Sequence, residues 1–227
     1  MRVDDPLMRR RHRGYSALLL TCVGVIACLL LPHGLRRLAA IGYMALPLVL
    51  IHSLGMPIQE GRWPGLRQRV FRLLGLITLA ASVWWYLTPL SQRSTGVVLL
   101  VLWTVFVVWS CERLIRNLSL ERTITREVLQ GALAGYLLLG LAAGLVFSAL
   151  ETIDPNSPVW ALDFVELNYF AFVTLTTTGY GDIHPMTPQS QMICVVVAIT
   201  GTMYLALVMG LLIGRYTARG VEDDLEG

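Results

Sequence analysis

Thr176-Thr177-Thr178-Gly179-Tyr180-Gly181-Asp182 lies between two apolar segments and constrains how the rest of the chain is arranged. Glycine adopts positive φ without steric cost, so Gly179 and Gly181 allow successive backbone carbonyls to point the same way. A ring of such carbonyls can replace the water shell of a dehydrated potassium ion. The stretch therefore predicts a K⁺ site built mainly from backbone. The oxygen atoms that would hold the ion belong to Thr177 (carbonyl and hydroxyl), Thr178, Gly179 and Tyr180.

The residues around this stretch are unusually apolar. Hydrophobic residues make up 55% of the 227-residue chain, against about 45–50% in soluble domains. Blocks near the ~20 residues that cross a bilayer occur at 14–32, 38–56, 70–88, 95–112, 127–150 and 190–216. A shorter block at 162–175 fits a re-entrant helix buried in protein. We therefore predict an all-α membrane protein with six transmembrane helices and one half-span between the fifth and the sixth.

The basic residues indicate the orientation of these helices. All eighteen are arginines that flank apolar blocks without forming a basic face, so nucleic acid is not an expected partner. With the N-terminus inside, fifteen arginines lie on the inner side, and only Arg36, Arg37 and Arg93 lie outside. We expect a multi-pass protein of a bacterial cell membrane, with both termini cytoplasmic. The ion-binding stretch then lies near the outer face.

The half-span has a recognisable start. Asp163-Phe164-Val165-Glu166 predicts an N-cap with an acid three residues later. The helix would run to Leu175 and direct its C-terminal dipole at the membrane centre, where it favours a cation. Pro185 and Pro188 then break the chain before the long final helix.

Tyr169 through Pro188, with the spans before and after, resembles the pore module of tetrameric potassium channels. The layout of four spans followed by this module resembles six-span members of the voltage-gated-like ion channel superfamily. The motif match covers about residues 160–216, and the first four spans match only in number and orientation. The resemblance implies four parts: a cytoplasmic N-terminus (1–13), a four-helix voltage-sensor-like domain (14–116), a pore domain (127–217) and a short cytoplasmic tail (218–227). The pore domain would comprise outer helix, pore helix, selectivity filter and inner helix.

The resemblance also implies roles for residues behind the ion sites. Gly181 would shape the outer exit of the filter and Asp182 would brace the filter from behind. The chain departs from the family at Thr178, where Val is frequent, and at Val173, where some relatives place an acid that pairs with the aspartate. A hydrogen bond between Tyr169 and Asp182 is the expected substitute for that pair.

One chain supplies a quarter of a carbonyl ring, so the resemblance implies a homotetramer with three identical subunits as partners. Membrane lipid is a further expected contact, and a separate regulatory protein remains an open alternative. No cofactor is expected beyond K⁺ as the permeant ion.

The final helix carries two candidate gating features. Gly201, twenty residues after Gly181, can act as a hinge or as a site of close packing against the fifth span. Leu205, Met209 and Ile213 recur every four residues, and four copies can close a hydrophobic gate by dewetting. Lipid or helix contact is the alternative for these three.

Two further features concern regulation. Four copies of His184 would ring the outer mouth and titrate near neutral pH; a solvated loop histidine is the alternative. The fourth span has no arginine before Arg113 and Arg116, which we interpret as topology anchors, so we predict weak voltage dependence.

The sequence therefore predicts a potassium-selective channel and no enzyme. A less selective cation channel is an alternative because of Thr178. A regulatory subunit that binds a partner through its first four helices is another.

Overall fold

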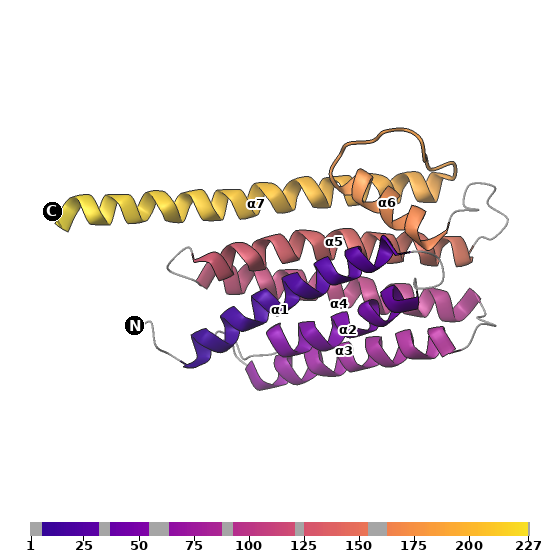
Figure 1. Ribbon diagram of the computed structural model, residues 1–227, viewed down its shortest axis with the longest axis horizontal. Helices are drawn as coiled ribbons and strands as arrows, with labels where there is room; N and C mark the ends of the chain where they lie inside the picture. Colours follow the sequence, from indigo (N-terminus) through magenta and orange to yellow (C-terminus); the bar gives the residue numbers. More distant parts are fainter. Residues whose placement is uncertain are drawn as a thin grey trace.

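The computed structural model describes residues 6–31, 37–54, 64–87, 93–120, 125–153 and 163–226. Apart from the loop at 176–187 and a few residues at helix ends, the described residues are helical. The short helix at 164–175 is inclined to the long helices (Figure 1). The last helix runs beside α5, and its C-terminal end projects past the others. The helices are α1 (Pro6–Leu29), α2 (Arg37–Leu54), α3 (Pro64–Leu87), α4 (Arg93–Leu120), α5 (Arg126–Ile153), α6 (Phe164–Leu175) and α7 (Pro188–Glu226).

Helix α5 joins the first four helices to the rest of the chain. Helices α1 to α4 pack each against the next, and both α1 and α4 also pack against α5, so the five form a closed ring. One apolar core runs through this ring and extends to α7 at Tyr204 and Val208. A second core, around Phe147, Leu167 and Phe170, holds α6 between α5 and α7. Helix α6, the predicted half-span, is therefore held on two sides by the long helices α5 and α7.

The glycines of α5 provide the space for these contacts. Gly135 lies under the Tyr204 hydroxyl of α7, and Gly140 lies under the Phe172 ring of α6. The Tyr204 hydroxyl also donates a 2.8 Å hydrogen bond to the Ala132 carbonyl. Small residues thus allow close helix contact, as expected in membranes.

Helices exist at all seven predicted places, but several extend beyond the apolar blocks. Helix α1 begins at Pro6 rather than at 14, α4 ends at Leu120 rather than at 112, and α7 continues to Glu226. Hydropathy marks the part of a helix that suits lipid, whereas arginine and glutamate continue a helix readily into water. The tail predicted at 218–227 is thus helical up to Glu226.

Among the described residues, three helices are long and apolar enough to cross a bilayer: His12–Leu29, Arg126–Leu150 and Pro188–Val208. Shorter apolar helices occur at Ile41–Leu54 and Phe164–Leu175. The protein is therefore an all-helical membrane protein. The complete count of six spans stays a prediction, because α2, α3 and α4 are not among the three helices.

Hydroxyl groups within the helices bond to the preceding turn. Thr78 donates to the Leu74 carbonyl at 2.8 Å, and Ser110 donates to the Phe106 carbonyl at 2.7 Å. Thr200 does the same with the Val196 carbonyl at 2.7 Å. In lipid, where water cannot satisfy polar groups, such internal bonds keep serine and threonine compatible with a buried helix.

Candidate ion-binding site

Helix α6 begins where the sequence predicts. The Asp163 carboxylate accepts hydrogen bonds from the backbone N–H groups of Val165 and Glu166 at 2.9 and 3.0 Å. In return, the Glu166 carboxylate accepts from the Asp163 N–H at 2.7 Å. This capping box satisfies N–H groups at the start of the helix. The capping box therefore sets the position at which α6 starts. The other end of the helix, at Leu175, leads directly into the loop.

The loop after α6 has an alternating backbone. Thr177, Gly179 and Gly181 have φ of 58°, 56° and 80°, whereas Thr178 and Tyr180 do not have positive φ. Alternation between left- and right-handed conformations directs successive carbonyls to one side of a chain and N–H groups to the other. The predicted K⁺ ligands therefore lie on a backbone suited to presenting a row of oxygens.

Thr177 has a backbone conformation that sequence reasoning did not anticipate. Positive φ is an outlier for a β-branched residue and costs of order 1–3 kcal/mol. The conformation must therefore be held by neighbouring bonds, and these lie immediately behind the loop. Strain of this kind clusters at functional sites, which adds weight to the loop as the site.

The bonds behind the loop attach it to the end of α6. The Val173 carbonyl accepts from the Thr178 N–H at 3.0 Å and from the Gly179 N–H at 3.4 Å. The Thr176 hydroxyl donates to the Phe172 carbonyl at 2.8 Å and lies 2.8 Å from the Thr178 hydroxyl. A threonine in place of valine at position 178 thus gains a polar partner behind the filter, consistent with a side chain that faces away from the ion. Sequence reasoning missed Thr176 as an anchor of the loop.

The outer part of the loop is bonded to the middle of α6. The Tyr169 hydroxyl donates a 2.6 Å hydrogen bond to the Asp182 carboxylate. This is the bond expected to replace the acid pair that Val173 rules out. The Tyr169 hydroxyl holds the pKa of Asp182 below its ordinary value of 3.8, because the bond favours the ionised carboxylate. The bond therefore stabilises the folded loop above the ordinary pKa and is lost as pH falls through the lowered value.

Replacing Tyr169 by Phe is expected to raise the pKa of Asp182 toward 3.8, because the bond that favours the ionised carboxylate is removed. A ¹³C NMR titration of the Asp182 carboxyl measures this directly. The phenyl ring of Phe keeps most of the packing, so a change in titration reports the hydroxyl alone. An unchanged titration midpoint in Tyr169→Phe would show that the bond does not hold the carboxylate.

Gly201 of α7 lies against the end of α6. It is buried, and a Cβ at this position would overlap the Leu175 carbonyl oxygen. The atoms nearest to a Cβ at this position belong to Leu175 of α6, and packing of Gly201 against the fifth span stays a prediction. Helix α7 is continuous through Gly201, and hinge bending stays a prediction.

The remaining predicted residues lie apart from the loop backbone. Leu205 is 46% exposed in the single chain, as a residue facing a pore or a neighbouring chain would be. The side chains of Met209 and Ile213 lie outside the described residues, so the hydrophobic gate stays a prediction. His184 is exposed, two residues after Asp182.

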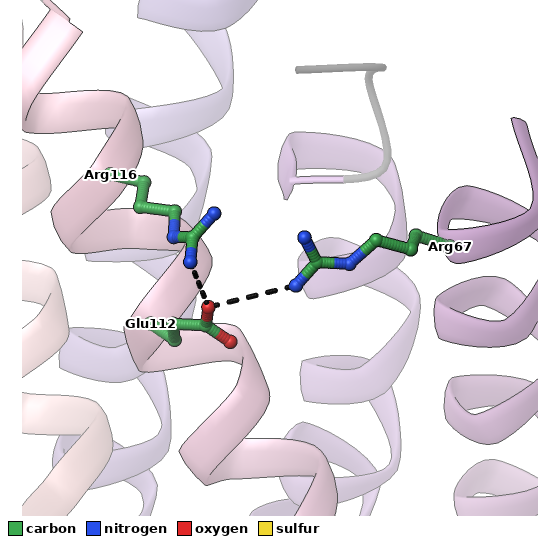
Figure 2. Close-up of polar contacts among 3 residues, drawn as sticks. All are labelled: Arg67, Glu112 and Arg116. Atoms are coloured by element: carbon green, nitrogen blue, oxygen red, sulfur yellow. Dashed lines mark ion pairs between the residues drawn. The ribbon is translucent and has the colours of Figure 1, made fainter. Parts of the chain in front are cut away.

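The two arginines of α4 differ in their surroundings. Arg116 forms an ion pair with Glu112 at 2.8 Å, and Arg67 of α3 reaches the same carboxylate at 3.8 Å (Figure 2). Arg113 is only 6% exposed, and its guanidinium lies 4.4 Å from the centre of the Phe71 ring. Arg116 is therefore partly exposed, whereas Arg113 of α4 is packed against Phe71 of α3. The interpretation of both arginines as topology anchors stays a prediction.

The chain resembles known channels over the segment that contains this loop. Residues 134–218 match the family described as ion channel, which covers most of α5, all of α6, the loop and α7 up to Ala218. A voltage-gated potassium channel of Aeropyrum pernix is 34% identical over 96 residues, which are 42% of this chain. Both matches are to ion channels, and neither is to an enzyme. The chain spans 28% of the length of that relative. No solved structure matches the chain.

Proposed function

We propose that this protein is a potassium-selective channel that conducts K⁺ passively across the cell membrane. The observation that carries the proposal is the alternating backbone at Thr177, Gly179 and Gly181, which suits a row of carbonyls that replaces the ion's hydration shell. Two hydrogen bonds attach this row to α6: the Thr178 N–H donates to the Val173 carbonyl, and the Tyr169 hydroxyl donates to Asp182. The resemblance to the potassium channel of Aeropyrum pernix supports K⁺ as the ion.

The proposed channel is a homotetramer, because one chain supplies one quarter of a ring. Apolar side chains that α7 leaves exposed provide a surface for neighbouring chains and lipid. They are Met192, Val195, Val196, Ile199, Met203 and Leu207. With its 39 residues, α7 is about 58 Å long and exceeds a hydrocarbon core of about 30 Å. Its last turns therefore extend into the cytoplasm in the proposed orientation.

Purified protein in lipid bilayers tests the proposal. With different K⁺ and Na⁺ gradients on the two sides, we expect the reversal potential to follow K⁺ and to ignore Na⁺. A reversal potential set by both ions would favour the less selective cation channel. Absence of any current or flux from the purified protein would favour a regulatory subunit. The mass of the intact complex by native mass spectrometry tests the tetramer.

The same recordings test voltage dependence. The segment of α4 from Val98 to Cys111 carries no charged residue, and Arg113 is confined beside Phe71. Each charge that crosses the field contributes about 2.3 kcal/mol per 100 mV, so few charges give a shallow response. A steep conductance–voltage curve would contradict this part of the proposal.

His184 provides a test at the outer mouth. Protonated histidines in a fourfold ring would repel K⁺, so acidification of the solution outside the membrane is expected to reduce the current. His184→Asn is expected to remove this effect while leaving the current at neutral pH. Equal acid inhibition in the variant and the parent protein would favour a solvated loop histidine without a role.

A further inference from the structure

One residue of the first four helices reaches α6 directly. Tyr43 of α2 donates its hydroxyl to the Asn168 side-chain oxygen at 2.5 Å, across 125 residues of sequence. Tyr43 and Asn168 are only 5% and 2% exposed. The Tyr43 ring also packs edge-on against Phe164, with 5.3 Å between ring centres. Helix α2 therefore contacts the first turns of α6 through both a polar and an aromatic contact.

The Asn168 amide is enclosed on its other sides. Its NH₂ group donates to the Phe164 carbonyl at 2.8 Å, which leaves the amide oxygen to accept from Tyr43. Gly144 of α5 lies directly beneath, where a Cβ would overlap the amide. Contacts from α2, α5 and α6 thus converge on this single buried side chain. A buried oxygen that loses its donor is costly, so the amide must move if Tyr43 cannot donate.

Asn168 is followed immediately by the residue that holds the filter loop. Consecutive side chains of a helix point about 100° apart, so Asn168 and Tyr169 leave α6 in different directions. Asn168 points to α2 and α5, whereas Tyr169 bonds to Asp182 at 2.6 Å. A rotation or shift of α6 at Asn168 therefore displaces the Tyr169 hydroxyl from Asp182.

Pro47 marks the same turn of α2. A proline four residues after Tyr43 cannot donate a backbone hydrogen bond to the Tyr43 carbonyl. The turn that carries Tyr43 therefore lacks one of the usual bonds of a helix. The contacts of the Tyr43 side chain with Asn168 and Phe164 therefore contribute more to the position of this turn than they would in an uninterrupted helix.

We propose that Tyr43 is a positioning residue for the filter, which sets the placement of α6 through Asn168 and thereby the Tyr169–Asp182 bond. This inference rests on the proposed function as far as conduction is concerned. It assigns a task to helices without gating charges: they support α6 from the side, so that a change in α2 alters the ion-binding loop.

The test observes the Tyr169–Asp182 hydrogen bond itself, through the NMR chemical shifts of the Tyr169 hydroxyl proton and Cζ in the full-length reconstituted protein at neutral pH. In Tyr43→Phe these shifts are expected to move toward those of Asp182→Ala, which lacks the acceptor, although the substitution lies on α2. In the double variant the two changes are expected to be less than additive, because both act through one bond.

Tyr15→Phe is the matched control. Tyr15 is a fully buried tyrosine of α1 that packs against Gly131 of α5. Its replacement perturbs the helix ring without touching α6, so the Tyr169 chemical shifts are expected to match those of the parent protein. Unchanged Tyr169 shifts in Tyr43→Phe, or an equal change in Tyr15→Phe, would overturn the proposal.

A second route to the same amide protects the test from a folding defect. Gly144→Ala displaces Asn168 from the side of α5 and is expected to change the Tyr169 chemical shifts in the same direction. If Tyr43→Phe does not fold, Gly144→Ala decides by the same criterion. The NMR measurement does not require ion conduction. A wild-type protein without K⁺ flux would therefore refute the proposed function while leaving the result on Tyr43 intact.

In a conducting protein, the K⁺/Na⁺ permeability ratio gives an independent reading. Tyr43→Phe is expected to lower this ratio, and Tyr15→Phe is expected to preserve it. A loss of current with an unchanged ratio and unchanged Tyr169 chemical shifts would indicate a purely structural role for Tyr43 and would contradict the proposal.

Discussion

Gly179→Ala is expected to abolish potassium flux. Gly179 has φ of 56°, and a left-handed conformation costs a residue with a Cβ about 1–2 kcal/mol. Four copies act on one proposed pore, so the cost is about 4–8 kcal/mol per tetramer. Since 1.4 kcal/mol corresponds to a factor of ten, the population of proposed tetramers with the conducting backbone conformation falls by about three orders of magnitude or more. Flux from reconstituted vesicles measures the loss.

Gly24→Ala separates this backbone effect from simple crowding. In the single chain, an added Cβ meets no atom within 4 Å at either Gly179 or Gly24. The two differ in their backbone, because Gly24 lies in α1 and does not have positive φ. Alanine there is expected to leave flux unchanged and to stabilise the helix by about 0.5–1 kcal/mol. Normal flux in Gly179→Ala would mean that the loop does not carry the ion.

Gly201→Ala is expected to reduce K⁺ flux and to lower the K⁺/Na⁺ permeability ratio. Its Cβ would overlap the Leu175 carbonyl oxygen at the end of α6, so α6 or α7 must move. Such overpacking costs about 1–3 kcal/mol. Alanine within a helix gains only about 0.5–1 kcal/mol. Permeability ratios in bilayers and thermal dissociation of the complex measure the effect.

Gly210→Ala is the matched control on the same helix. Gly210 has open space around a Cβ, so alanine there is expected to preserve selectivity and thermal stability. The hinge interpretation makes a different prediction for Gly201→Ala: slower opening, with the permeability ratio and the stability of the complex unchanged. That outcome would refute packing as the main role of Gly201.

Features determined by near neighbours in the sequence were predictable. The start of α6 was correct because Asp163 and Glu166 bond to backbone atoms within three residues. The positive φ values of Gly179 and Gly181 follow from the lack of a Cβ. Helix ends were predicted less well, since α1 and α7 continue past the apolar blocks that marked them.

Features that depend on distant partners were not predictable. Asn168 lies in the middle of an apolar half-span, and its partner Tyr43 belongs to α2. The only signal was an amide among apolar residues, which had to find a partner when buried. The positive φ of Thr177 opposes its own preference and is imposed by neighbouring bonds. The partner of Gly201 follows from the position of α6, which the sequence does not specify.

The short connection between α4 and α5 determines how a substitution in α2 affects an assembly that contains both altered and unaltered chains. Helix α4 ends at Leu120 and α5 begins at Arg126. Even when fully extended, the chain from Leu120 to Arg126 spans at most roughly 20 Å. Since α4 packs against the α5 that follows it, the first four helices stay with the α5–α7 segment of their own polypeptide. In mixed assemblies of the proposed tetramer, Tyr43→Phe is expected to disturb only the copy that carries it, and the deficit is expected to grow with the number of altered chains.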